Sequence, residues 1–315
     1  MTLRQAQGDR TNPAIAGIPL VLGGNVFGWT ADQDTSFAIL DAFYEAGGRM
    51  VDTADVYSAW VPGHKGGESE AVIGAWLANR GVRQDMRIHT KTGMLGGPEL
   101  YEPARLLQSL GQSLDRLQTD YLDLYYAHQD FAELPIADIV AAFDGAADKV
   151  RSLGASKFSA PRLHEALKAA NDAGSMPFTA LQNEYNLVSR AEYGADLQAL
   201  CTTNGIAMLP FYGIANGFLT GKYRTEADFG KSVRGGRMKK LIVTGVPMLA
   251  AMDAISAETG APLAQIALAW LAVQPGIAAP IASATSVAQV KELCGMASLS
   301  LTPGQLNSLD SAGPQ

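Results

Sequence analysis

The stretch MVDTADVY, residues 50–57, decides both the fold and the site that this sequence predicts. Its apolar start indicates the end of a buried strand, which places Asp52 at the rim of a sheet and Tyr57 on the following loop. An unperturbed phenol has a pKa near ~10, so Tyr57 can donate a proton usefully only if a nearby cation stabilises its conjugate base. The rest of the chain is therefore expected to supply a cation.

Two later stretches supply a cation and an imidazole. MRIHTKTG, residues 86–93, predicts a short strand that ends at Lys91. YLDLYYAHQD, residues 121–130, predicts another strand, which ends at His128. An amphipathic helical stretch precedes each of these strands, so that Asp52, Lys91 and His128 follow one another at intervals of about one strand-helix repeat.

The alternation of strand and helix extends along the whole chain. Expected strands cover residues 18–24, 49–52, 86–90, 122–127, 150–155, 178–182, 206–211 and 276–283. Expected helices cover residues 32–46, 68–79, 102–117, 135–149, 161–173, 191–204, 262–272 and 287–295. This pattern predicts an α/β protein whose parallel strands close into a (β/α)8 TIM barrel. An open doubly wound sheet is the alternative, but LVLGGNVFG lacks the GxGxxG spacing of its dinucleotide fingerprint.

The chain length fits one barrel as a single domain, because such barrels need ~250 residues and tolerate insertions. Residues 1–14 are expected to form a polar N-terminal tail. About forty residues after the seventh strand, from 211 to 247, interrupt the alternation, and loops of this length are usually lids or binding segments. We expect this segment, which contains GFLTGKY, to clamp a ligand. Its basic run, residues 231–240, is either a solvated loop or a contact to a cofactor phosphate.

Composition excludes several classes of function. The net charge of −7 argues against nucleic acid or an anionic membrane as partner, because both attract clustered basic surface. The first residues lack the apolar segment of a signal peptide, and two distant cysteines, Cys201 and Cys294, do not suggest a disulfide framework. These features predict a cytoplasmic protein. No HExxH or CxxC motif occurs, so we expect no metal site, and His89 is expected to be buried and hydrogen bonded.

Together, the residues at the strand ends predict a chemistry that no single one of them predicts. Taken singly, each residue has a structural explanation: the aspartate could cap a helix, the tyrosine ring could pack in the core, the lysine could be solvated and the histidine could be buried. At successive strand ends of a barrel, however, Asp52, Tyr57, Lys91 and His128 would converge. Reduction of a carbonyl needs a proton donor, here Tyr57, and dipoles aimed at the oxygen, here His128. Lys91 would lower the pKa of Tyr57, and Asp52 would hold Lys91.

The sequence also resembles the aldo-keto reductase family. The motifs DTADVY, HTKTG, YLDLYYAH, RSLGASKFS, LQNEYNL, GFLTGKY and PIASATSVAQV follow the order of that family and extend over nearly the whole chain. The resemblance implies an NAD(P)H-dependent oxidoreductase acting on CH-OH and C=O groups, with Asp52, Tyr57, Lys91 and His128 as its catalytic tetrad. It implies NADPH as cofactor, with NADH as the alternative, and a small aldehyde, ketone or alcohol as substrate.

The resemblance further implies which residues bind the cofactor. Ser156 and Gln182 would hold the nicotinamide carboxamide, and Phe211 would stack on the nicotinamide ring. Lys157, which stands where the family usually has asparagine, is a further implied cofactor contact. The remaining implied contacts are Asn25, Asp52, Tyr212, Gly213, Leu219, Lys222, Arg234, Ser283, Ala284, Thr285, Gln289 and Glu292.

The substrate pocket is expected to be an apolar cleft. Trp29, Trp60, Tyr126 and Phe131 are candidates for its lining, although core packing explains Tyr126 equally well. Gln129 follows His128 where the family commonly has tryptophan, which would open the pocket.

Two other functions stay open at this point. The family also contains potassium-channel beta subunits with the same tetrad, so a cofactor-binding regulatory subunit is the first alternative. A barrel aldolase or dehydratase that uses Lys91 as a Schiff base is the second, although it needs a neutral amine and Asp52 would keep Lys91 protonated. The sequence makes no prediction of an oligomeric state.

Overall fold

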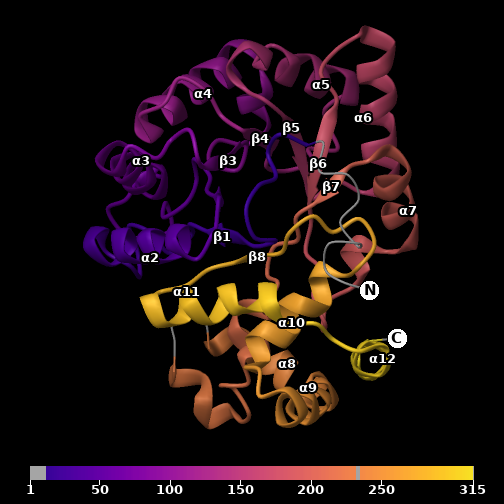
Figure 1. The fold of residues 1–315 in the computed structure, drawn as a ribbon. Helices are drawn as coiled ribbons and strands as arrows, with labels where there is room; N and C mark the ends of the chain where they lie inside the picture. The colour runs from indigo at the N-terminus through magenta and orange to yellow at the C-terminus, as the bar shows by residue number, and fades with distance from the viewer. Residues whose placement is uncertain (1–11, 232–234, 315) are drawn as a thin grey trace.

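Eight parallel strands form one sheet that curls round a common axis (Figure 1). The structure is a computed structural model and describes residues 12–231 and 235–314. The order of the strands is β7-β6-β5-β4-β3-β2-β1-β8.

Backbone hydrogen bonds join the two ends of the sheet, since Met208 N lies 3.0 Å from Gly276 O and Ala278 N lies 2.8 Å from Met208 O. The (β/α)8 barrel predicted from the sequence is confirmed. The strands are β1 (Val21–Gly23), β2 (Met50–Asp52), β3 (Arg87–Thr92), β4 (Leu124–Ala127), β5 (Leu153–Ser156), β6 (Phe178–Gln182), β7 (Ala207–Met208) and β8 (Ile281–Ala282).

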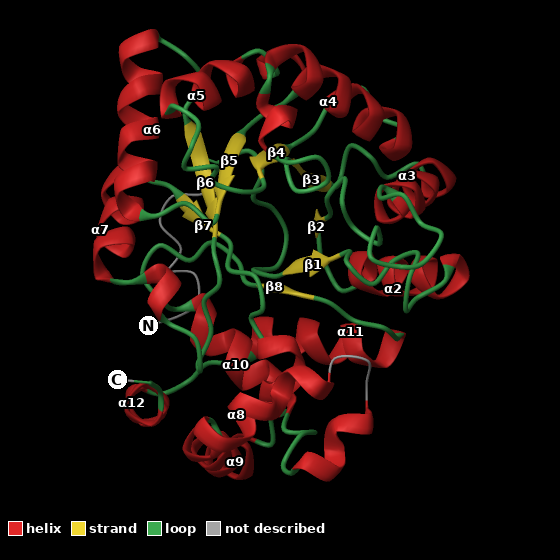
Figure 2. Cartoon of the chain, turned by 180° about the vertical axis from the view of Figure 1, so that it is seen from behind, coloured by secondary structure: helices red, strands yellow, loops and turns green. Residues whose placement is uncertain are grey.

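Helices surround this sheet (Figure 2). Apolar side chains from the helices and the outer strand faces form the main core, whereas a second cluster that includes Val21, Met50, Leu124 and Tyr126 fills the barrel. In the described chain, no helix is both long and apolar enough to cross a membrane. The helices that follow the strands are α2 (Gln33–Glu45), α3 (Glu68–Arg80), α4 (Pro103–Leu117), α5 (Ile136–Asp144), α6 (Ala160–Ala173), α7 (Ala195–Asn204), α10 (Leu263–Ala272) and α11 (Val287–Cys294).

The local sequence explains where several of these helices begin. The side chains of Asp32, Ser159 and Ser286 accept hydrogen bonds from backbone N–H groups in the first turns of α2, α6 and α11. Such caps replace partners that the first turn of a helix lacks. The observed strands β1, β7 and β8 are shorter than predicted. Pro210 and Pro280 fall in the predicted last two strands, and proline has no N–H to donate to a ladder.

Two long helices were missed by the sequence prediction, α9 (Val246–Thr259) and α12 (Pro303–Ala312). Both carry local signals. A capping box between Thr302 and Gln305 starts α12, with Pro303 in its first turn. The buried residues of α9 recur at helical spacing, namely Met248, Leu249, Met252 and Ile255.

The long segment after β7 is built from short helices. It contains the 3-10 helices η4 (Ala215–Thr220), η5 (Glu226–Lys231) and η6 (Gly235–Met238), followed by α8 (Lys239–Thr244). Asn216 and Gly217 have left-handed backbone conformations, with φ of 56° and 95°, which bend η4 sharply. Arg234, a predicted cofactor contact within the basic run 231–240, lies outside the described residues.

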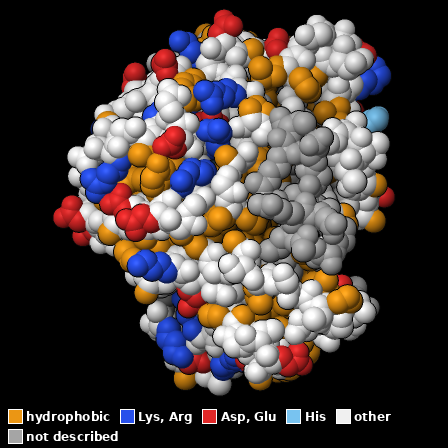
Figure 3. All heavy atoms as spheres, viewed as in Figure 1, with side chains coloured by type: hydrophobic (Ala, Val, Ile, Leu, Met, Phe, Trp, Pro, Cys, Tyr) orange, Lys and Arg blue, Asp and Glu red, His pale blue; other side chains and the backbone are white. Residues whose placement is uncertain are grey.

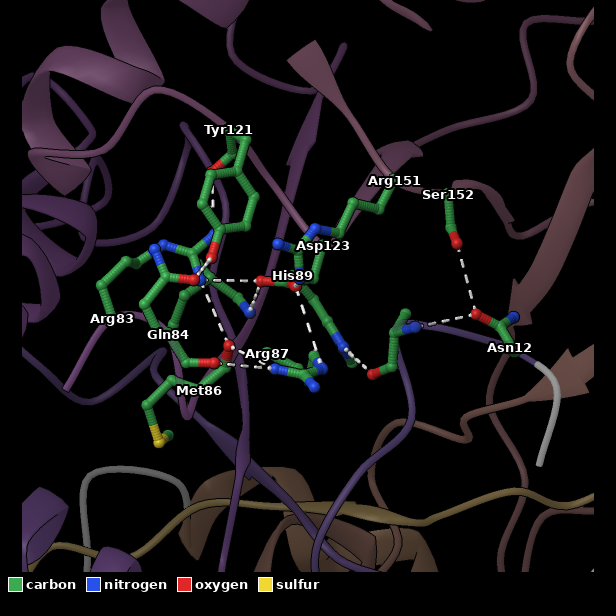
Figure 4. A network of polar contacts seen from close by, with 12 residues as sticks. Asn12, Arg83, Gln84, Met86, Arg87, His89, Tyr121, Asp123, Arg151 and Ser152 are labelled. Atoms are coloured by element: carbon green, nitrogen blue, oxygen red, sulfur yellow. Dashed lines mark hydrogen bonds and ion pairs between the residues drawn. The ribbon is translucent and has the colours of Figure 1, made fainter. Parts of the chain in front are cut away.

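Residues 12–15 form part of the barrel rather than of a tail (Figure 4). Asn12 Nδ2 donates to Thr179 O at 3.0 Å, and Ser152 Oγ lies 3.3 Å from Asn12 Oδ1. Ala14 is fully buried, and its carbonyl oxygen lies 2.9 Å from His89 Nε2. The predicted N-terminal tail is therefore too long by residues 12–14, because these contacts fix them under the barrel. The predicted burial and hydrogen bonding of His89 are confirmed.

A buried carboxylate joins β4 to neighbouring segments in the same region of the molecule (Figure 4). Asp123 is completely buried and pairs with Arg83 at 2.9 Å and with Arg151 at 3.0 Å. It also accepts a hydrogen bond from Ile88 N at 2.9 Å. The guanidinium groups of Arg83 and Arg151 both lie over the ring of Tyr121, at 3.8 and 4.1 Å from its centroid.

We expect Asp123→Asn to lower the free energy of unfolding by roughly 1.5–3 kcal/mol, because it removes the charge that makes these hydrogen bonds strong. The midpoint of urea unfolding measures this effect. Asp172→Asn is the matched control, since Asp172 forms an exposed pair with Lys168 on α6. The control should not shift the midpoint measurably, and an equal shift in both variants would contradict a special role for Asp123.

The surface shown in Figure 3 carries acidic and basic side chains interspersed with apolar ones. On this face the basic side chains do not form a continuous stripe of the kind that binds a phosphate backbone. The two cysteines, Cys201 and Cys294, are both buried as free thiols.

Candidate active site

The structure brings Asp52, Tyr57, Lys91 and His128 together at the carboxyl ends of β2, β3 and β4. Lys91 Nζ lies 2.6 Å from Asp52 Oδ2, 2.8 Å from the carbonyl oxygen of Thr53 and 3.2 Å from Tyr57 Oη. Tyr57 Oη lies 3.3 Å from Asp52 Oδ2. The rings of Tyr57 and His128 face each other edge to face, with centroids 6.2 Å apart. A phenol, an ammonium group and a carboxylate thus form one hydrogen-bonded cluster beside an imidazole.

The ion pair in this cluster is shielded from water. The side chain of Lys91 has no exposed area. Besides Asp52, its ammonium group contacts two further oxygen atoms, the carbonyl oxygen of Thr53 and Tyr57 Oη. Gln182 Nε2 donates to the second carboxylate oxygen of Asp52 at 2.9 Å. Both charges therefore have full sets of partners, which a buried pair needs if it is not to destabilise the fold. Gln182, predicted to hold a carboxamide, supports Asp52 as well as lining the cleft described below.

The pKa of Tyr57 is raised overall in this structure, so the expected effect of Lys91 does not bring it below its ordinary value. Burial raises the pKa of the Tyr57 phenol well above its ordinary value, and the Asp52 carboxylate raises it further. The ammonium group at 3.2 Å does not offset these two effects. Burial also lowers the pKa of Lys91, while Asp52 acts in the opposite direction. Tyr57 consequently keeps its proton at neutral pH, which is the state that a proton donor requires.

His128 is neutral at physiological pH. Burial lowers its pKa well below the ordinary histidine value, and the positive charges of Lys91 and Lys157 lower it further. Its Nδ1 atom is buried and has no hydrogen-bond partner within the described part of the chain. A neutral imidazole carries one N–H donor, so His128 can hydrogen bond an oxygen beside Tyr57.

A cavity of about 720 Å³ opens beside the cluster. Asp52, Tyr57 and His128 line it. Most residues that the resemblance assigns to the cofactor line it too, namely Asn25, Ser156, Lys157, Gln182, Phe211, Tyr212, Gly213, Lys222, Ser283, Thr285, Gln289 and Glu292. Leu219 and Ala284 do not line it, because both side chains are fully buried in the main core.

The candidates for the substrate pocket separate into different environments. Trp60 lines the cavity, is half-exposed, and packs edge to face against Tyr57 and Trp29, at centroid distances of 6.1 and 5.5 Å. Tyr126 belongs to the cluster inside the barrel, and its ring centroid lies 5.8 Å from Lys91 Nζ. Its assignment to the pocket is therefore wrong. Phe131 packs on Tyr101 at 5.1 Å.

Gln129 does not line the cavity either, since its side chain contacts Lys157 and the backbone of Asp130.

Sequence reasoning missed several lining residues. Met94 follows β3, and Asn216, Gly217 and Thr220 come from η4. The Asn-Gly pair is a strong turn signal, which could have indicated a sharp backbone bend at this point. Among the described residues, no three His, Cys, Asp or Glu side chains gather in a way that could hold a metal ion.

Asp55 is a buried acid in the turn between Asp52 and Tyr57. Its Oδ2 atom accepts a hydrogen bond from Thr92 Oγ1 at 2.7 Å, whereas Oδ1 has no partner in the described part of the chain. Burial raises the pKa of Asp55 to about 6, and Glu70 contributes in the same direction.

This pKa predicts a dependence of stability on pH. Because the pKa of Asp55 is higher in the folded state than its ordinary value near ~4, the folded state binds more protons between these two values, and stability falls as pH rises from about 4 to 6. Asp55→Asn should therefore stabilise the protein by roughly 1–3 kcal/mol at pH 7, with a smaller gain towards pH 4. Urea unfolding at several pH values measures the gain. A gain that does not vary with pH would contradict this assignment.

The chain is similar in sequence to proteins named as reductases, a dehydrogenase and channel subunits. The sequence profile of the Aldo/keto reductase family matches residues 19–314. Norsolorinic acid reductase B of Aspergillus parasiticus is 29% identical over 93% of this chain and 80% of its own length. Aryl-alcohol dehydrogenase (NADP+) of Phanerodontia chrysosporium is 28% identical over 90% of this chain and 77% of its own length. A probable voltage-gated potassium channel subunit beta of Oryza sativa subsp. japonica is 30% identical over 84% of this chain and 83% of its own length.

Proposed function

Because the chain belongs to the aldo/keto reductase family, we propose that it is an NADPH-dependent oxidoreductase that interconverts an aldehyde or ketone and the corresponding alcohol. One observation supports this most strongly. A protonated phenol, Tyr57 Oη, lies 3.2 Å from a buried ammonium group, Lys91 Nζ, at the end of a large cleft. A proton donor backed by a fixed cation is what the oxygen of a carbonyl needs when negative charge develops on it.

The lining of the cleft fits a nicotinamide dinucleotide. Ser156 and Gln182 are almost fully buried and present polar side chains next to the tetrad, where they would hold the carboxamide. Phe211 lines the same cleft and would pack on the nicotinamide ring. When bound, the reduced dinucleotide supplies the hydride for the carbonyl carbon.

Other residues that line the cleft fit phosphate groups and a ribose. Lys222 brings an ammonium group into it, and Thr285 and Gln289 line it at the start of α11. The N–H groups of a helix start attract negative charge, so this end would hold the adenosine part of the dinucleotide. NADPH is the proposed cofactor because the family usually uses it, and NADH is the alternative.

Each tetrad residue then has a separate task in the reduction. Tyr57 Oη donates its proton to the carbonyl oxygen, and Lys91 compensates the negative charge that the phenolate acquires. Asp52 keeps Lys91 protonated and in place through the 2.6 Å contact. His128, neutral at physiological pH, donates a hydrogen bond to the same oxygen and orients it towards Tyr57. Trp60 extends the wall of the cleft beyond Tyr57 and would pack against the body of the substrate.

Loss of absorbance at the reduced nicotinamide band tests this function. The purified protein is mixed with NADPH or NADH and with a panel of aldehydes, ketones and sugars. We expect many turnovers per chain with NADPH and at least one aldehyde, and none without a carbonyl compound. No oxidation of either nucleotide with any carbonyl would contradict the proposal.

A second candidate is a cofactor-binding regulatory subunit, which the similarity to the channel beta subunit favours. That function predicts slow oxidation of at most one bound nucleotide per chain. Schiff-base chemistry at Lys91 is a weaker candidate, because three oxygen atoms surround its buried Nζ and Asp52 favours the charged form. Borohydride trapping of a substrate on Lys91 would support it. We also propose a cytoplasmic location, with which two free buried cysteines agree.

A further inference from the structure

Lys157 brings a positive charge into the cleft next to the tetrad. It follows β5 directly after Ser156 and lines the cavity together with His128 and Met94. Strands β4 and β5 are paired, with Ala127 opposite Ala155, so Lys157 leaves the barrel beside the strand end that carries His128. A carbonyl held by Tyr57 and His128 would thus have an ammonium group near it.

The partners of this ammonium group are neutral. Lys157 Nζ lies 3.2 Å from Gln129 Oε1 and 3.3 Å from the thioether sulfur of Met94. Asp130, which follows Gln129, is held by Arg162 at 2.8 Å. Within the described residues, Lys157 forms no ion pair with a carboxylate. Burial lowers the pKa of Lys157, and the charge of Glu192 opposes this effect. A half-buried ammonium group whose partners are all neutral should bind an anion more tightly than an ammonium group in water would. Hydrogen bonds between charged groups are about twice as strong as those between neutral groups.

The backbone at this residue is held in an unfavourable conformation. Lys157 has a φ of 61°, in the left-handed region where residues other than glycine and asparagine are uncommon. Such a conformation costs on the order of 1–3 kcal/mol and persists where its surroundings fix it, which often happens at functional sites. Here Lys157 N donates to Gln182 O at 3.1 Å, which ties the residue to the end of β6. The bend carries the lysine side chain over the cleft.

We propose that Lys157 recognises an anionic group on the carbonyl substrate, and that the protein prefers carbonyl compounds that carry a carboxylate. The proposal rests on the proposed function, because Tyr57 and His128 must hold the carbonyl oxygen while Lys157 binds the anion. The rings of Tyr57 and Trp60 line the same cavity and offer apolar surface to the body of such a substrate. An aromatic aldehyde with a carboxylate on its ring combines both features.

Paired substrates separate the effect of the charge from the reaction itself. We compare kcat/KM for 4-carboxybenzaldehyde with that for its neutral methyl ester, methyl 4-formylbenzoate, in the full-length protein with saturating nucleotide. The wild type should prefer the carboxylate. Lys157→Met should reduce the ratio of the two values by roughly 10- to 100-fold, the range expected when a hydrogen bond between charged groups is lost. Lys157→Arg should keep the preference, since it keeps the charge.

The matched control is Lys168→Met, which changes the net charge equally at an exposed site on α6. It should leave the ratio at its wild-type value. An unchanged ratio in Lys157→Met would overturn the proposal. If the KM for the nucleotide rises while the ratio stays the same, Lys157 would contact the cofactor instead of the substrate.

Failure of the proposed function has a different signature. If the wild type oxidises NADPH with the ester but shows no preference for the carboxylate, the anion site is wrong while the reductase function stands. If it reduces neither compound, binding of 4-carboxybenzaldehyde is measured by calorimetry in the wild type and in Lys157→Met. Binding that the substitution weakens would then support the anion site without the reaction, and equal or absent binding would contradict it.

Discussion

Replacing Tyr57 with phenylalanine is expected to lower kcat for carbonyl reduction by roughly 10²- to 10⁴-fold, the contribution of a positioned acid. The substitution removes the hydroxyl group and keeps the ring that packs against Trp60 and His128. The lining of the cleft therefore stays in place, and the dissociation constant for NADPH, measured by fluorescence titration, should change little. A loss of kcat without a loss of nucleotide affinity assigns Tyr57 to the chemical step.

Tyr121→Phe is the matched control, because the hydroxyl group of Tyr121 donates to Gln84 Oε1 at an exposed site and does not line the cleft. Its kcat should equal that of the wild type. If Tyr57→Phe also keeps a wild-type kcat, Tyr57 is not the proton donor.

Replacing Lys91 with methionine should abolish measurable turnover and also destabilise the fold. Methionine fills similar space but leaves the Asp52 carboxylate buried without its cation. Removing one partner of a buried ion pair typically costs about 3–5 kcal/mol, because the remaining charge has lost its compensation. Urea unfolding should show this loss in Lys91→Met.

A double variant isolates the ion pair from the effect of packing. Asp52→Asn keeps the shape of the side chain and removes its charge. The double variant Lys91→Met/Asp52→Asn should therefore lose less free energy of unfolding than the two single variants lose in sum. The difference should be at least about 1 kcal/mol. Strict additivity would contradict a buried ion pair, and recovery of turnover in the double variant would contradict the assigned role of Lys91.

The sequence predicted the arrangement of the tetrad because that arrangement follows from periodicity. Residues at the carboxyl ends of adjacent parallel strands lie side by side once the sheet exists, so Asp52, Lys91 and His128 needed only three strand boundaries to be placed. Errors of one or two residues in those boundaries had little effect. Lys91, for example, is followed in β3 by Thr92 rather than ending the strand, yet its side chain still points towards Asp52.

Features that depend on the packing of distant segments could not be predicted in this way. The direction of the pKa shift of Tyr57 depends on how completely the cleft walls exclude water, which no local pattern records. Leu219 lies in a segment of which other residues line the cleft, but the sharp bend at Asn216 and Gly217 directs its side chain into the core. The neutral partners of Lys157 come from the loops after β3 and β4, so its availability for an anion is visible only in three dimensions.

In the proposed reaction, a hydride reaches the carbon of a carbonyl whose oxygen Tyr57 protonates. Mass spectrometry of the alcohol formed from a carbonyl compound and NADPH deuterated at the transferable position follows both transfers. The proposed reaction predicts alcohol with one deuterium on the carbinol carbon. The wild type should form many such molecules per chain and Tyr57→Phe very few. Unlabelled product, or equal labelled product from both proteins, would contradict it.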